Sequence, residues 1–214
     1  MNNEHIVQLT QYLEYSVNEI MVKLEASAKD STVSQPNDML EKLLIVALKN
    51  EWETALLSSN WAINEADHHF AVLLTRLAGD EAKHYIMIEK LLNKKITLDQ
   101  KRSPLYLFLL GLEDTFSRVV CGPFTREFLA VRRNRLFLLF CEKYQLSEAL
   151  SIYTEIQKDE DFHHQLGISL LSEILESESN FLQAKQLIKK MLNIVDDMQE
   201  MATLKMGLAY LPGC

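Results

Sequence analysis

The sequence predicts an all-α protein, and two observations support this. Apolar residues recur at three- and four-residue spacing through long segments, which is the period of an amphipathic helix. Glycine and proline, which interrupt helices, number only six and four among the 214 residues. Because a chain of this length can bury one sizeable core, we expect residues 1–214 to form a single helical domain.

Polar or turn-forming stretches divide the periodic segments into elements. The predicted helices span, in order, about 5–28, 38–66, 68–93, 105–120, 123–144, 146–176 and 178–206. Polar connections are expected at 29–37, between the first and second helices, and at 94–103, between the third and fourth. Gly122-Pro123 is expected to break or kink the most apolar run, since proline lacks a backbone N–H. The tail at 207–214 is expected to be loose.

Two copies of the pattern Asp-Glu-x-x-His interrupt apolar stripes, at Asp80-Glu81-x-x-His84 and Asp159-Glu160-x-x-His163. Residues three apart lie on the same face of a helix, so each copy presents a carboxylate and an imidazole together. A carboxylate on an apolar face costs free energy unless it is paired or bound to metal. A third match, Glu65-x-x-His68, falls at a predicted turn, where we expect both side chains to be solvated.

Two further glutamates lie on the stripes of the neighbouring helices. Glu51 falls on the stripe of the second helix, with Glu53 as the alternative, and Glu127 falls on the stripe of the fifth. Residues at one height in an antiparallel hairpin are equally far from its turn. The midpoint of Glu51 with Glu81 is residue 66, inside the turn predicted at 64–69, and that of Glu127 with Glu160 is about residue 144, at the turn predicted at 143–145.

Four carboxylates and two imidazoles are a ligand set for two divalent first-row metals, with carboxylates bridging them. The predicted ligands are therefore Glu51, Glu81, His84, Glu127, Glu160 and His163. Asp80 and Asp159, next to the ligand glutamates, are expected to accept a hydrogen bond from the outer N–H of a ligand histidine. Two iron ions are the expected cofactor, with manganese or a mixed pair as the alternative.

On these motifs, residues 38–176 resemble the ferritin-like di-iron carboxylate superfamily. The resemblance implies an antiparallel four-helix bundle, here with additional N-terminal, middle and C-terminal helices. Two E-x-x-H motifs are more similar to oxygenases, ribonucleotide reductase small subunits and rubrerythrins than to storage ferritins. There is no Cys-x-x-Cys pair for a rubredoxin-type centre.

The implied function is a non-haem di-iron oxygenase or oxidase, which takes O2, an electron donor and a small or carrier-bound organic substrate. Ferroxidase, peroxide-scavenging or metal-handling activity is the alternative, and transfer-RNA hydroxylation is a weaker one. An oxygenase needs a cavity ending at the metals. Small residues on the stripes, Ala47, Ala55, Ser58 and Ala78, predict it between the Glu51 and Glu81 helices.

Charge, hydropathy and cysteine content limit the kinds of binding partner and the cellular location that we expect. The net charge of −8 argues against nucleic acid and anionic membranes. No apolar run reaches the length of a membrane span, and the first residues are too polar for a signal peptide. An odd cysteine count (Cys121, Cys141, Cys214) suits reduced thiols in a cytoplasmic protein, and a homodimer is compatible with the sequence. The arginines at 126, 132, 133 and 135 are expected to form a solvated basic face.

Overall fold

The computed structural model describes residues 2–30 and 34–213, and within these ranges every regular element is a helix. The elements are α1 (Asn2–Asp30), α2 (Pro36–Ile63), α3 (His68–Leu92), α4 (Pro104–Leu110), α5 (Thr115–Val119), the π-helix η1 (Val120–Arg126), α6 (Glu127–Lys143), α7 (Ser147–Ile174) and α8 (Glu178–Met206). The all-α prediction is confirmed. In the described part of the chain, no helix combines the length and hydropathy that a membrane crossing requires.

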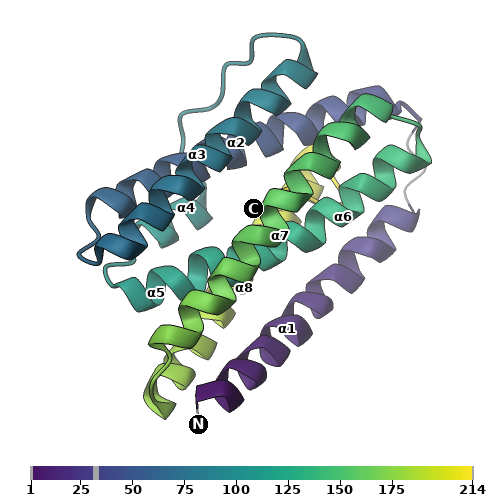
Figure 1. The fold of residues 1–214 in the computed structure, drawn as a ribbon. Helices are drawn as coiled ribbons and strands as arrows, with labels where there is room; N and C mark the ends of the chain where they lie inside the picture. Colours follow the sequence, from purple (N-terminus) through teal and green to yellow (C-terminus); the bar gives the residue numbers. More distant parts are fainter. Residues whose placement is uncertain (1, 31–33, 214) are drawn as a thin grey trace.

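Helices α2 and α3 form the first antiparallel hairpin (Figure 1). Pro36 occupies the first turn of α2, where its missing N–H costs nothing. The hairpin turns between Ile63 and His68, and the carboxylate of Asp67 caps α3 by accepting hydrogen bonds from the backbone N–H groups of His69 and Phe70. The predicted turn is therefore confirmed, and it sets Glu51 opposite Glu81.

Helices α6 and α7 form the second hairpin, whose turn lies between Lys143 and Ser147. Gln145 adopts a positive φ of 55° there, which reverses the chain within three residues. Helix α3 packs against α7, so the two hairpins face each other across a shared interior (Figure 1).

The sequence predicted a break or kink of the helix at Gly122-Pro123, but the structure places the break between α4 and α5. Helix α4 ends at Leu110, followed by Gly111, and Asp114 caps α5 by accepting a hydrogen bond from the backbone N–H of Ser117. The chain then stays helical through η1 into α6, with Pro123 inside the π-helix. Because π-helical hydrogen bonds run to the fifth residue, this wider turn accommodates a residue that has no N–H to donate.

Two glycines let η1 lie at the centre of the molecule, where all its residues are buried. A Cβ added to Gly167 of α7 would stand 2.3 Å from the backbone carbon and oxygen of Pro123. A Cβ added to Gly122 would stand 2.9 Å from the ring of Trp61 on α2. Backbone-to-backbone contact between α7 and η1 is therefore possible only because residue 167 has no side chain.

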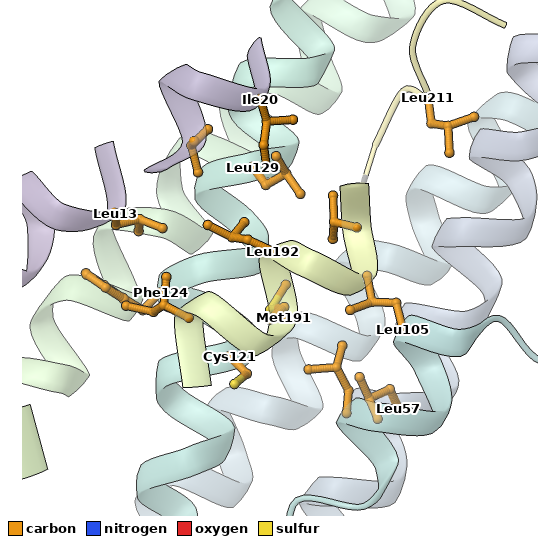
Figure 2. Packing of buried hydrophobic residues seen from close by; sticks show 14 of the residues in the cluster. Leu13, Ile20, Leu57, Leu105, Cys121, Phe124, Leu129, Met191, Leu192 and Leu211 are labelled. Atoms are coloured by element: carbon orange, nitrogen blue, oxygen red, sulfur yellow. The ribbon is translucent and has the colours of Figure 1, made fainter. Parts of the chain in front are cut away.

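Helices α1 and α8 complete the fold on the other side of η1. Helix α8 packs against α1, α4 and η1. Figure 2 shows the resulting core, in which Leu13 and Ile20 of α1 approach Leu192 of α8, and Phe124 and Met191 lie close by; all five are buried. The stripe of α8 is thus covered by α1, α4 and η1, and that of α1 by α8, α7 and α6.

The carboxyl-terminal tail is packed rather than loose. Leu208, Tyr210 and Leu211 are buried. The backbone N–H of Gly213 donates to Asn134 of α6 at 2.9 Å, and Asn50 of α2 donates to the carbonyl of Pro212 at 3.1 Å. The tail therefore joins the two hairpins in the middle of the molecule (Figure 1). Cys214 lies outside the described residues, and Cys121 and Cys141 are buried free thiols.

We predict opposite effects for alanine at two helical glycines. Gly167→Ala should lower the free energy of unfolding by about 2 kcal/mol or more, because the new methyl group collides with the backbone of Pro123. Gly79→Ala should raise it by about 1 kcal/mol, because Gly79 is exposed with nothing within 4 Å of the added Cβ and alanine is the better helix former. Urea unfolding of both variants measures the difference, and equal effects would contradict this packing.

Candidate metal centre

The structure brings all six predicted ligands together between the two hairpins. They come from four helices: α2 supplies one glutamate, α6 another, and α3 and α7 each supply a glutamate and a histidine. All six side chains are buried: Glu51, Glu81, His84, Glu127, Glu160 and His163. The motifs are buried because each lies at mid-height on the inward stripe of its helix, as the turn positions predicted.

The ligand atoms form two groups that share two residues. In one group, Glu51, Glu81, His84 and Glu160 each offer one atom, and these atoms all lie within 4.8 Å of one another. In the other, Glu81, Glu127, Glu160 and His163 do the same. Glu81 and Glu160 belong to both groups, while Glu51 and Glu127 belong to one each.

The two shared carboxylates point one oxygen at each histidine. Nδ1 of His84 lies 3.7 Å from Oε2 of Glu81 and 3.7 Å from Oε1 of Glu160. Nδ1 of His163 lies 3.8 Å from Oε1 of Glu81 and 3.7 Å from Oε2 of Glu160. With this geometry Glu81 and Glu160 would be able to bridge two metal ions, one beside each histidine. The remaining glutamates close the ends, Glu51 at 3.5 Å from His84 and Glu127 at 3.8 Å from His163.

Most of the ligand atoms around the two histidines have no hydrogen-bond partner in the described part of the chain. The buried atoms without a partner among the described residues include Oε2 of Glu51, Oε2 of Glu81, Nδ1 of His84, both carboxylate oxygens of Glu160 and Nδ1 of His163. Buried polar atoms are normally satisfied, and leaving several unpaired in one place is costly. Divalent cations would satisfy them all at once, so the donor set fits a pair of metal ions.

The two histidines are oriented by aspartates of the opposite motif. Nε2 of His84 contacts Asp159 at 3.2 Å, and Nε2 of His163 contacts Asp80 at 3.1 Å. An ionised carboxylate can only accept, so Nε2 carries the proton and Nδ1 is left to bind metal. The predicted role of these aspartates is thus supported by geometry, with each aspartate reaching across to the other helix rather than serving its own motif.

A cation holds each orienting aspartate. Lys83 lies 3.1 Å from Asp159, and Arg76 lies 3.7 Å from Asp80. Burial raises the pKa of Asp159, but the hydrogen bonds from His84 and Lys83 outweigh it and leave that pKa lowered. The aspartate therefore stays ionised and keeps its histidine in one tautomer.

Arg126 is the site residue that sequence reasoning missed. The sequence predicted it on a solvated face, but its side chain is 5% exposed, and Arg133 is buried as well. Its Nη1 donates to Thr54, and its Nη2 donates to Glu127 and, at 3.4 Å, to Glu81. Because it is the last residue of η1, a segment buried all round, helical periodicity alone could not place it inside.

Glu53, the alternative ligand, and the third motif at Glu65 and His68 are not part of the cluster. Glu53 is buried, but its carboxylate accepts from the backbone N–H of Ser103 at 3.0 Å and lies 3.6 Å from Lys49, so Glu51 is the residue at the cluster. The expectation that Glu65 is solvated is wrong. Its side chain is 2% exposed and pairs with Arg118 at 3.1 Å, whereas His68 is exposed as predicted.

The buried carboxylates of the cluster repel one another, and burial and this repulsion raise the pKa values of two of them. Burial raises the pKa of Glu160 to about 8, with Glu81 and Glu127 adding to the effect. Burial and the charge of Glu81 raise the pKa of Glu51 well above its ordinary value. Burial also acts on Glu127, but Arg126 outweighs it and holds that pKa well below its usual range.

The pKa values of His84 and His163 are raised, whereas burial alone lowers the pKa of a histidine. Burial lowers their pKa values, but the neighbouring carboxylates outweigh it. Glu51 and Glu81 raise the pKa of His84 to about 12, and Glu127 and Glu160 raise that of His163 to about 11. Without metal, the cluster therefore neutralises itself with protons on its own ligands.

No protein-family model, curated protein or solved structure matches this chain.

We predict that metal binding strengthens as pH rises and releases protons. Both histidines hold a proton at Nδ1 below pH values of about 12 and 11 and must lose it to bind metal, so the two ions together displace at least two protons at pH 7. Affinity should increase by roughly tenfold per pH unit for each proton displaced by an ion. Mn²⁺ titrations at pH 6, 7 and 8 with an indicator dye test this. Affinity that is constant with pH would contradict it.

We also predict that Asp159→Asn weakens metal binding about 10- to 100-fold, because it removes the anionic acceptor that orients His84. Asp161→Asn, two residues along the same helix and exposed, is the matched control and should change nothing. Metal dissociation constants for both variants decide the point. Equal values for the two would show that the contact with His84 has no influence on the site.

Proposed function

We propose that this chain is a ferritin-like di-iron protein that activates O2 to oxidise a small or carrier-bound organic substrate, with electrons from a separate donor. The observation that supports it best is the pair of shared carboxylates, Glu81 and Glu160, each with one oxygen toward either histidine. A site for one ion needs no such sharing. A pair of ferrous ions supplies O2 with two electrons at one place, which no side chain of the chain can do.

The protein's own residues would bind, orient and shield the pair. Terminal ligation would come from Glu51 with His84 and from Glu127 with His163, and Asp159 and Asp80 would hold the two imidazoles in register. Burial of the whole cluster keeps bulk water from the reacting centre. Arg126 would hold Glu127 and Glu81 through its hydrogen bonds while adding a positive charge beside the ions.

Tyr153 is a further polar group beside the cluster. Its ring is fully buried at 4.1 Å from the ring of Phe137, and its hydroxyl has no hydrogen-bond partner in the described part of the chain. Burial and the charge of Glu51 raise its pKa well above the ordinary value, so the hydroxyl keeps its proton. It could donate that proton in a hydrogen bond to a molecule bound at the metals.

A small, partly open pocket lies beside the site. It lies against α2 and α4, with Thr54 and Arg126 in its wall, rather than between α2 and α3 as the small residues suggested. Ala47 and Ser58 are instead buried in helix packing. Transfer-RNA hydroxylation loses the feature that favoured it, since two of the four clustered arginines are buried.

The test is to load the protein anaerobically with Fe²⁺, count the iron per chain, and mix it with O2. We expect two ions per chain, O2 consumption limited to a few equivalents, and no mineral core. Take-up of many irons per chain would instead support ferroxidase or storage activity. Less than one ion per chain would refute the dinuclear site.

Matched glutamates on α2 sharpen this test. Glu51→Ala should abolish binding of at least one of the two ions, because it removes a terminal ligand that contacts His84. Glu53→Ala removes a carboxylate just as deeply buried on the same helix, but one that contacts Ser103 and Lys49, so it should keep both ions. Elemental analysis of both variants distinguishes a ligand from a buried structural carboxylate, and equal iron contents would contradict the assignment.

A further inference from the structure

The carboxyl-terminal tail enters the interior of the molecule next to the metal centre. Residues 210–213, which we call the tail cover, are all buried. A Cβ added to Gly213 would stand 3.4 Å from Oε1 of Glu51, the glutamate whose other oxygen lies beside His84. That is a contact distance, so the backbone at Gly213 lies against one end of the ligand cluster.

The tail cover lies between two helices that otherwise have little contact. Helix α2 packs mainly against α3 and α4, and α6 packs mainly against α7, η1 and α1. The side chain of Asn50 on α2 donates to the carbonyl of Pro212 at 3.1 Å. The side chain of Asn134 on α6 accepts from the backbone N–H of Gly213 at 2.9 Å. The tail cover therefore bridges the two hairpins where the chain ends between them (Figure 1).

A metal ion can reach the ligands only if a covering segment moves, because none of the six ligand residues is more than 2% exposed. On two other sides the covering groups are positively charged, which disfavours the approach of a divalent cation. Arg126 lies against Glu127, and Lys83 and Arg76 lie against the two orienting aspartates. The tail cover has no charged side chain, and the two side chains that hydrogen-bond its backbone are neutral amides.

The tail is held firmly at its base and less firmly beyond it. The carbonyl of Leu208 accepts from the side chains of both Gln199 and Thr203 on α8. In the tail cover, the hydroxyl of Tyr210 is buried without a hydrogen-bond partner in the described part of the chain, and so is Nδ2 of Asn134 beneath it. Water reaches such groups when a segment leaves, so opening recovers part of their desolvation cost.

We propose that residues 210–213 form a cover that moves outward to admit metal ions at the Glu51 end of the centre and then closes over them. The proposal rests on the dinuclear centre proposed above and adds the route by which it is loaded. Leu208 stays bound to α8, so the movement is confined to the residues after it. Because ions enter only the open form, the rate of metal uptake is proportional to the population of that form.

Hydrogen exchange measures the opening in the absence of metal. The chain has six glycines, so protein labelled with ¹⁵N-glycine resolves the Gly213 amide among only a few signals. This amide should exchange at least about 100-fold faster than that of Gly167, which lies against the backbone of Pro123 in the core and needs a larger unfolding to exchange. Equal protection of the two amides would show that the cover does not open locally and would overturn the proposal.

Two alanine variants should speed exchange and metal uptake together. Asn50→Ala removes the donor to the tail carbonyl, and Asn134→Ala leaves the N–H of Gly213 buried without its acceptor. Each should raise the Gly213 exchange rate and the initial rate of Co²⁺ uptake by the same factor, about fivefold or more. Asn60→Ala, exposed on the same helix as Asn50, is the matched control and should change neither rate.

A third variant should have the opposite effect. Tyr210→Phe removes the buried hydroxyl that has no partner, so it should stabilise the closed tail and slow both rates, by about threefold or more. This reversal distinguishes a cover from a general loosening of the fold, since a variant that merely destabilises the protein does not slow metal uptake.

Faster Gly213 exchange with unchanged Co²⁺ uptake in Asn50→Ala and Asn134→Ala would overturn the cover while leaving a metal centre that still binds two ions. Faster uptake in Tyr210→Phe would also contradict it. If neither the unmodified chain nor any variant takes up Co²⁺, the proposed metal centre is refuted and the cover with it, a result that failure of the cover alone does not produce.

Discussion

The structure depends on the burial of four carboxylates in one interior. Such a cluster is strongly unfavourable unless positive charge enters with it, because like charges a few ångströms apart repel strongly where water is absent. Among the described residues, positive charge beside these carboxylates can come from the two imidazoles, which can hold protons, and from Arg126. Everything around the cluster either positions these groups or excludes water from them, which is the organisation expected of a metal centre.

The pseudo-symmetry of the centre follows from two hairpins with matched motifs. Each hairpin contributes one helix with a glutamate and one with Asp-Glu-x-x-His, and each orienting aspartate reaches the histidine of the other hairpin. The crossed contacts tie α3 to α7 at two heights. Asp80–His163 and Asp159–His84 thus hold the helices together as well as orienting the ligands, so ligand geometry and helix packing are determined by the same side chains.

Arg126 breaks this symmetry. The π-helix in which it lies has no counterpart in the first hairpin, and it is held at the centre by Gly167 and by the contact of Gly122 with Trp61. The result is a centre with a guanidinium at Glu127 and Glu81 and a cavity on that same side. The tail approaches elsewhere, where Gly213 lies near Glu51, so the two ends of the cluster have different surroundings.

The sequence by itself determined most of the helices, the two hairpin turns and the candidate ligands with Glu53 as an alternative to Glu51, because these depend on local periodicity and on equal distances from a turn. The heights of Glu81 and Glu160 follow from that arithmetic, whereas the choice of Glu51 over Glu53 came from the structure, in which Glu53 contacts Ser103 and Lys49. Only the tertiary structure decided the rest. The burial of Arg126, the ion pair of Glu65 with Arg118 and the docking of the tail between Asn50 and Asn134 all join residues far apart in the chain. Helical periodicity describes one face of one helix, and it carries no information when, as in η1, every face is covered by a different neighbour.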